Sequence, residues 1–299
     1  MLTYALAVDA FCASVTPVES AALKQSKFRD FELTMGFYMA EDETARASAA
    51  MTRELIADGT IHAASMHLPF CPVPYREGGP EWDPSELDEP KRRDNIRQMI
   101  RFLRNHADLL APMATYHASG EPPLSEHPQR IAQTCRSLEE LMPVAQEFGF
   151  VINVEFLPRT CVGNCVEELQ EILSHFDPDR VGICLDVNHC MTRYRELPQL
   201  IDTLAPRIRA FHLSDYDGID ENHWMPGQGV IDWRETMKHI RAIDHDLLLI
   251  LETTRQLKRP SRPIDPLFAI RQNERAVWFL ENCGRLVPEI EAFRFPGCR

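Results

Sequence analysis

Four polar side chains stand at or near the ends of four successive apolar runs in the second half of the chain. The runs are FVINVEF, VGICLDVNH, IRAFHLSD and LLLILETT, and they carry Glu155, Asp186, His212 and Glu252. Each run is typical of a buried parallel strand, and stretches with helical periodicity separate the runs. Because side chains alternate faces along a strand, the four residues can point to one side of a parallel sheet. This pattern predicts a repeating βα unit with its polar groups at one end.

The whole chain contains eight strand candidates, which is the number that closes a barrel of alternating strands and helices. We therefore predict an α/β fold, a (β/α)8 TIM barrel, as a single domain over residues 1–299. The expected strands are Tyr4–Ala10, Phe28–Leu33, His62–Leu68, Met113–His117, Val151–Leu157, Val181–Val187, Ile208–Leu213 and Leu247–Glu252.

Apolar residues at helical offsets predict amphipathic helices between these strands. A polar residue followed three positions later by glutamate indicates a helix start, and Asn164 and Asp232 have this spacing. The expected helices are Glu41–Ala57, Asn95–Leu110, Arg130–Phe148, Val166–His175 and Trp233–Ile243, with a C-terminal helix or tail at about 265–299.

Two loops are longer than the connections usual in such a repeat. They span Phe70–Pro90, which is rich in proline, glycine and acidic residues, and Tyr216–Gly229. Loops of this length are typical of lids over a substrate. Each contains a tryptophan, Trp82 or Trp224, which can either cover a sugar ring or anchor the loop by packing.

The composition limits the environment and the partners of the protein. No apolar run approaches the roughly 20 residues of a membrane helix, so we expect no membrane partner. The first residues lack a basic segment and include Asp9, which favours a first strand over a signal peptide and predicts a cytoplasmic protein. Nine cysteines form an odd set without a zinc-site pattern and are expected to be reduced thiols. A net charge of −13 disfavours nucleic acid as a partner.

A set of three carboxylates and one imidazole suits one hard or borderline divalent ion, namely Mn²⁺, Mg²⁺, Co²⁺ or Zn²⁺. We therefore predict a metal site at Glu155, Asp186, His212 and Glu252. The alternative for each residue is a polar strand end that a helix N-terminus satisfies. No organic cofactor is expected, because the only Gly-x-Gly, in the second long loop, lacks the rest of a dinucleotide fingerprint.

The strings HLSDYDG, HWMPGQGVIDW and LDVNH, with the two strand-end glutamates, resemble the xylose isomerase-like barrel superfamily of sugar and sugar-phosphate isomerases and epimerases. The resemblance covers essentially the whole chain. It implies that the four predicted ligands hold the metal, that Glu155 and Glu252 also move a proton through an enediolate, and that His189 contacts the substrate. A small-molecule carbohydrate is the implied partner, and a homo-oligomer is compatible with the fold.

Further histidines lie at or just past strand ends and are candidates for substrate binding. The complete set of substrate-binding candidates is His67, His117, His189, His223 and Trp224. For each histidine, a hydrogen bond at the barrel rim or a solvated position is the alternative. His223 stands where ketose 3-epimerases carry an arginine, which favours another isomerase, epimerase or dehydratase of this scaffold over a free-ketose 3-epimerase.

The same barrel also hosts the endonuclease IV family of zinc-dependent abasic-site nucleases, and this chain has side chains for the nine-ligand pattern of that family. Glu221 replaces the aspartate of its D-x-H motif, and VEFLPR and LDVNH depart from its LET and LDTCH strings. We keep this nuclease, a dehydratase and a non-catalytic sugar-binding barrel as alternatives. The nine side chains are His67, His117, Glu155, Asp186, His189, His212, Glu221, His223 and Glu252.

Overall fold

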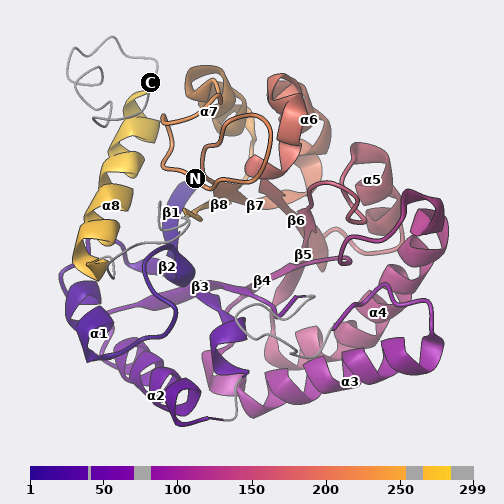
Figure 1. Cartoon of the computed structure of the whole chain (residues 1–299), viewed down its shortest axis with the longest axis horizontal. Coiled ribbons are helices and arrows are strands. Elements are labelled where there is room, and N and C mark those ends of the chain that lie inside the picture. Colours follow the sequence, from indigo (N-terminus) through magenta and orange to yellow (C-terminus); the bar gives the residue numbers. More distant parts are fainter. Residues whose placement is uncertain (40–41, 71–81, 254–264, 284–299) are drawn as a thin grey trace.

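The structure is a computed structural model of the chain and describes residues 1–39, 42–70, 82–253 and 265–283. Eight parallel strands close into one barrel in chain order, and helices surround it (Figure 1). The predicted single-domain (β/α)8 barrel is confirmed. The strands are β1 Leu2–Ala7, β2 Asp30–Thr34, β3 His62–His67, β4 Met113–Tyr116, β5 Val151–Phe156, β6 Val181–Asp186, β7 Ile208–Leu213 and β8 Leu247–Leu251.

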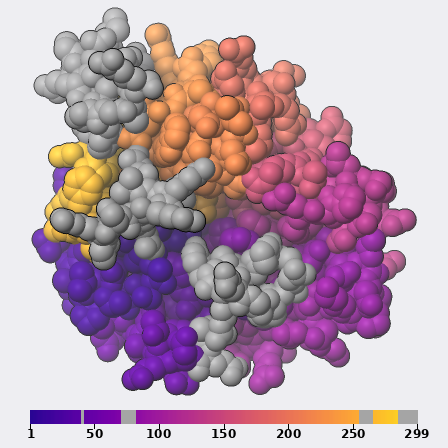
Figure 2. Space-filling view, viewed as in Figure 1, coloured from indigo at the N-terminus to yellow at the C-terminus, as the bar shows by residue number. Residues whose placement is uncertain are grey.

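Each strand is followed by a helical segment, so the colours run around the rim of the molecule in chain order (Figure 2). The α-helices are α1 Pro17–Leu23, α2 Glu43–Ala57, α3 Glu89–Asn105, α4 His127–Phe148, α5 Val166–Ser174, α6 Leu197–Leu204, α7 Trp233–Ala242 and α8 Pro266–Asn282. The 3-10 helices are η1 Val8–Ala10, η2 Met35–Tyr38, η3 Ala107–Leu109, η4 Leu124–Glu126, η5 Asn188–Glu196 and η6 Ala205–Arg207.

Apolar side chains form two separate clusters because the strands are buried on both faces. The larger cluster fills the layer between strands and helices. The smaller cluster lies in the barrel lumen and consists mainly of small side chains. Its buried members are Ala5, Ala7, Ala64, Cys184, Ala210, Leu248 and Ile250. The lumen is therefore a packed core, with polar side chains beyond it toward the carboxyl ends of the strands.

Several element boundaries differ from the prediction for local reasons. β1 ends at Ala7, and the next three residues form η1. Helix α3 begins at Glu89 because the side chain of Asp88 accepts a hydrogen bond from the Lys91 amide. Helix α4 begins at His127, followed by a proline that suits a first turn. Helices α1 and α6 were not predicted from the sequence.

One predicted helix start is wrong and one is confirmed. Cys165, and not Asn164, is the N-cap residue of α5, and the Asn164 amide donates to the Arg159 carbonyl instead. Asp232 caps α7 as expected, because its carboxylate accepts from the Glu235 backbone amide.

The two long loops differ in how much of them the structure describes. Residues 71–81 of the first loop and 284–299 of the tail lie outside the described residues. Trp82 is buried, and its ring lies edge-on to Phe102 of α3 at 6.1 Å between centroids, so this tryptophan is a packing anchor. Among the described residues, no helix is both long and apolar enough to cross a membrane.

Candidate metal centre

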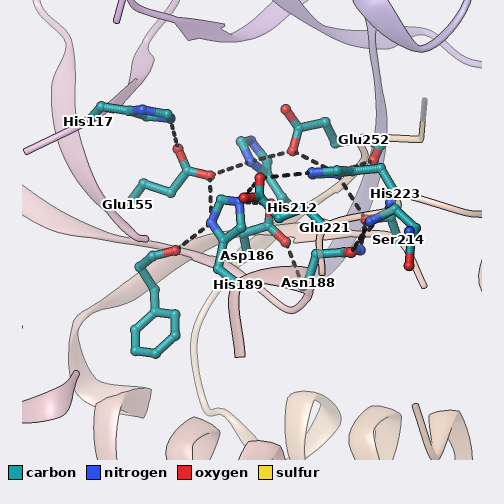
Figure 3. A network of polar contacts seen from close by, with 12 residues as sticks. His117, Glu155, Asp186, Asn188, His189, His212, Ser214, Glu221, His223 and Glu252 are labelled. Carbon is teal, nitrogen blue, oxygen red and sulfur yellow. Dashed lines mark hydrogen bonds and ion pairs between the residues drawn. The ribbon is translucent and has the colours of Figure 1, made fainter. Parts of the chain in front are cut away.

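The four predicted ligands converge at the carboxyl ends of β5 to β8 (Figure 3). Glu155 lies in β5, Asp186 is the last residue of β6, His212 lies in β7, and Glu252 directly follows β8. One donor atom from each side chain lies within 4.8 Å of the other three. Parallel pairing of β6 and β7 places Asp186 next to His212 in register. Strand order therefore brings together residues that are 97 positions apart in the chain.

Carboxylate oxygens that accept no hydrogen bond gather in this cluster. They are Glu155 Oε2, Asp186 Oδ2 and Glu252 Oε2, and all three are buried. Histidine nitrogens lie 2.8, 3.3 and 3.0 Å from these atoms, which places oxygen and imidazole donors around one point. A divalent cation accepts oxygen and imidazole nitrogen donors together. The four side chains therefore fit a divalent ion.

The protonation of the carboxylates reflects burial and nearby histidines. Burial alone raises the pKa of Glu155, but His117 and His212 hold it well below its usual range. Glu252 is half-buried, and its partial burial raises its pKa, but His212 above all lowers that pKa to about 2. Burial raises the pKa of Asp186 to about 6 against the opposing effect of His189. Both glutamates are therefore carboxylates at neutral pH, as a base or a metal ligand requires.

A second group of donors shares Glu155 with the first. His67 ends β3, and His117 directly follows β4. Their Nε2 atoms lie 3.4 Å and 2.8 Å from Glu155 Oε2. The two rings contact each other edge to face at 5.0 Å between centroids. The structure thus places both substrate-binding candidates against the predicted metal cluster, and the His67 ring also stacks on that of His212 at 5.8 Å between centroids.

A third group of donors shares Asp186. His189 in η5 and His223 in the β7–α7 loop lie with Asp186 so that one donor atom of each is within 4.8 Å of the others. Glu221 Oε2 lies 3.3 Å from His189 Nε2 and 3.7 Å from His223 Nε2. Glu221 also forms an ion pair with Arg159, which lies just beyond β5. This pairing joins the β7–α7 loop to the β5–α5 loop.

Backbone carbonyls orient two of these histidines. His67 Nδ1 lies 2.9 Å from the Leu68 carbonyl, and His189 Nδ1 lies 2.8 Å from the Phe156 carbonyl. Since a carbonyl only accepts, Nδ1 carries the proton in both rings and Nε2 faces the carboxylates. Carbonyl partners of this kind are usual behind metal-binding histidines.

The Tyr216–Gly229 loop is fixed by Asp215, which lies two residues after the end of β7. Its carboxylate accepts from the backbone amides of Tyr216, Gly227 and Ile231 and from the Trp233 indole. Its backbone pairs with that of Trp224 through two hydrogen bonds of 2.7 Å. Asp215 therefore holds the loop in place, and none of these hydrogen bonds is to His212. Trp224 is half-buried beside the cluster residue His223.

Sequence reasoning did not find two carboxylates that lie at the same mouth. Glu32 in β2 is buried, and its Oε1 lies 2.9 Å from His212 Nε2. Asp9 in η1 has a buried oxygen without a partner, and burial, followed by Glu252, raises its pKa to about 6. The signal for Glu32 was a charged residue inside the apolar run DFELT. Its contact with β7 depends on barrel closure and has no local signature.

Comparison with known proteins shows the family of this chain. The family model described as xylose isomerase-like TIM barrel matches residues 20–273. The chain belongs to this family. It is 24% identical over 193 residues to the uncharacterized protein MJ1311 of Methanocaldococcus jannaschii, covering 62% of this chain and 63% of that protein. It is 27% identical over 125 residues to the inosose isomerase of Bacillus subtilis, covering 40% of this chain and 45% of the isomerase.

Solved structures show the same fold at low sequence identity. A D-tagatose 3-epimerase-like protein superposes with a TM-score of 0.72 at 18% identity, covering 94% of this chain and 98% of its own. The IOLI protein with a bound zinc atom superposes with a TM-score of 0.66 at 15% identity, covering 94% of this chain and 98% of its own.

Proposed function

We propose that this protein is a divalent-metal-dependent isomerase or epimerase of a sugar, sugar phosphate or related polyol or keto acid. The observation that carries the proposal is the convergence of Glu155, Asp186, His212 and Glu252 within 4.8 Å, with three buried carboxylate oxygens that accept no hydrogen bond. Relatives named inosose isomerase and D-psicose 3-epimerase support the substrate class. The zinc atom in the IOLI structure supports a metal site on this fold.

The two glutamates are suited to moving a proton. Glu155 and Glu252 approach the cluster from opposite sides in Figure 3 and are both deprotonated at neutral pH. A divalent ion held by the four side chains would polarise the substrate carbonyl and so lower the cost of removing a proton from the neighbouring carbon. One glutamate takes that proton, which leaves an enediolate, and the other returns a proton. Return to the opposite face gives the epimer, and return to the adjacent carbon gives the aldose or ketose isomer.

The remaining polar residues at the mouth are proposed to hold the substrate hydroxyls. His67, His117, His189 and His223 each lie near a cluster carboxylate. Trp224 adjoins His223 and is half-buried. Imidazole nitrogens can donate to or accept from sugar hydroxyl groups, which orients the reacting carbon toward the glutamates.

Metal content and turnover together test the proposal. Protein purified without chelator should hold one divalent ion per chain, and Asp186→Ala should lose it. Asp202→Ala is the matched control, because Asp202 is exposed on α6 and pairs only with His239 among the described contacts. A panel of ketoses, aldoses and inososes is assayed with solvent-deuterium exchange as the readout. Full metal occupancy in Asp186→Ala would refute the ligand assignment. If the metal-loaded parent showed hydrogen exchange with none of the substrates, the proposed isomerase or epimerase reaction would be refuted.

A second candidate, a multinuclear phosphodiesterase of the endonuclease IV type, is favoured by the three overlapping donor groups. Glu155 belongs to two of these groups and Asp186 to two. Carboxylates shared in this way are typical bridges between metal ions about 3.5 to 4 Å apart. The candidate predicts two or three zinc ions per chain and cleavage of abasic DNA that weakens with salt.

Metal stoichiometry separates the two candidates. His117→Gln removes a donor from the second group and leaves the predicted ligands Asp186, His212 and Glu252 intact. One ion per chain in both the parent and this variant supports the isomerase. A fall from two or three ions in the parent to a smaller number in the variant, together with abasic-site cleavage by the parent, supports the nuclease.

A further inference from the structure

Glu32 is a buried carboxylate on the side of the barrel opposite the ligand-bearing strands. It belongs to β2, whereas the four predicted ligands come from β5 to β8 and the residue after β8. Its side chain is 1% exposed, and it crosses the lumen to His212 on β7. β2 pairs only with β1 and β3, so this contact is made across the barrel and not along the sheet.

The hydrogen bonds of Glu32 fix its orientation. Oε2 accepts from the Ser65 hydroxyl at 2.7 Å and from the Thr115 hydroxyl at 3.0 Å. Oε1 is then directed at His212 Nε2 at 2.9 Å. The two hydroxyls belong to β3 and β4, the next two strands in the barrel after β2. Three buried partners on three different strands hold the carboxylate in one position.

This arrangement decides which nitrogen of His212 carries hydrogen. A carboxylate only accepts hydrogen bonds, so the atom that faces Glu32 must be Nε2–H. The other nitrogen, Nδ1, lies 3.2 Å from Glu155 Oε1 and 3.0 Å from Glu252 Oε2. Without an ion, Nδ1 also carries hydrogen and donates to these carboxylates. A cation bound between the two carboxylates would take the place of that hydrogen, so Nδ1 is the atom of His212 that faces the predicted ion.

We propose that Glu32 is a positioning residue that holds His212 as the Nε2–H tautomer, so that Nδ1 is available as a metal ligand. The inference rests on the proposed metal site. Carboxylates behind metal-binding histidines orient the ring and raise its basicity, and removal of such a partner typically weakens metal affinity about 10- to 100-fold. Glu32 acts through His212 and has no contact with the three ligand carboxylates among the interactions described above.

The test compares the parent with Glu32→Ala and Glu32→Gln by Zn²⁺ affinity in chelator competition and by histidine ¹⁵N chemical shifts. Glu32→Ala should weaken Zn²⁺ binding about 10- to 100-fold. Glu32→Gln can present either its carbonyl or its amide to Nε2, so it should populate both tautomers and bind more weakly than the parent. Asp202→Ala is the control, because Asp202 is exposed on α6 and pairs with His239 away from this network, and it should bind Zn²⁺ like the parent.

The outcomes distinguish failure of the proposed role of Glu32 from failure of the metal site on which that role depends. Parent-like Zn²⁺ affinity and parent-like ¹⁵N shifts of His212 in Glu32→Gln would overturn the role of Glu32, even if Glu32→Ala does not fold. Turnover of the zinc-saturated variants should recover toward the parent value if Glu32 only positions the ligand. A parent protein that binds no ion would instead refute the proposed metal site, and its His212 shifts would still report whether Nε2 carries hydrogen.

Discussion

Glu155 lies within 4 Å of four histidines. His117, His212, His67 and His189 approach its two oxygens at 2.8, 3.2, 3.4 and 3.6 Å. Burial raises the pKa of this carboxyl group, but His117 and His212 hold it well below its usual range. Glu155 is thus a carboxylate at neutral pH.

Replacing either proposed base with glutamine should slow proton transfer while an oxygen ligand remains. We expect Glu155→Gln and Glu252→Gln each to lower turnover by about 10² to 10⁴-fold, because a general base is removed. Glu235→Gln, an exposed substitution on α7, should leave turnover unchanged. The measurement is kcat together with exchange of substrate hydrogen for solvent deuterium. Parent-rate exchange by metal-loaded Glu252→Gln would assign the proton to Glu155 alone or to His189.

At the scale of elements, the β7–α7 loop is held in place by close backbone contacts. Gly229 lies against the Tyr216 carbonyl and the Asp215 carboxylate, and a Cβ atom at this position would overlap both. Asp215 in turn accepts from Gly227 and from the Trp233 indole. The loop that carries Glu221 and His223 is therefore positioned by the residues at its base.

Gly229→Ala should destabilise this loop through steric overlap alone. We expect a loss of about 3 kcal/mol in the free energy of unfolding, since a side chain is forced against fixed backbone. Gly59→Ala is the control, because Gly59 has open space around it and a φ of +74°, which costs about 1 kcal/mol for alanine. Urea denaturation compares the two variants. A Gly229→Ala cost no larger than that of Gly59→Ala would show that the loop base adjusts.

The helices and loops also protect the thiols that they carry. Cys135 lies in α4 and Cys161 in the β5–α5 loop, and both are buried. Burial raises their pKa values to about 11 and about 12. None of the seven cysteines among the described residues is part of a disulfide.

Alkylation by iodoacetamide should therefore depend on folding and on pH. Only the thiolate reacts, so a raised pKa lowers the reactive fraction at pH 8 by more than about 100-fold for Cys135. The native rate should rise about tenfold per pH unit toward pH 10, because the thiol stays below its pKa throughout that window. Peptide mass spectrometry in native buffer and in denaturant measures the rates. Equal rates in both conditions would contradict the effect of burial.

At the scale of the whole molecule, closure of the barrel joins its first and last strands. β1 pairs with β8 over Leu2 to Leu6, and the amino group of Met1 lies 2.7 Å from Asp246. The proposed ligands come from one half of this closed sheet, and Glu32 comes from the other half. An ion bound among them would connect strands that are distant in sequence, which links metal binding to global stability.

A divalent ion should therefore raise the thermal stability of the native protein. At a free concentration of 100 times the dissociation constant, binding adds about 2.7 kcal/mol to the free energy of unfolding. We expect Tm to increase with added Mn²⁺ or Zn²⁺ in the parent and in Asp202→Ala, and not in Asp186→Ala. Scanning calorimetry provides the values. A metal-induced rise in Tm that Asp186→Ala retains would place the ion elsewhere.

Much of the fold follows from patterns within single elements. Apolar runs with period-2 facing predicted all eight strands, and the carboxylate or imidazole near the end of four of them predicted the cluster at Glu155, Asp186, His212 and Glu252. The strands and the closeness of these four side chains could be predicted because strand facing is a local property and parallel strands end on the same side, whereas their role as ligands stays a prediction. Helices α1 and α6 escaped prediction because they are short, so few turns display their periodicity.

Only the tertiary structure decided how groups from distant elements meet. Closure of the barrel brings Glu32 of β2 to His212 of β7, and the path of the β7–α7 loop brings Glu221 to Arg159 and His189. The tertiary structure also buries Trp82 against α3 and directs the Asp215 side chain to the base of the β7–α7 loop. Sequence spacing carries no information about such contacts, because they depend on which side chains fill the lumen and where each loop leaves its strand.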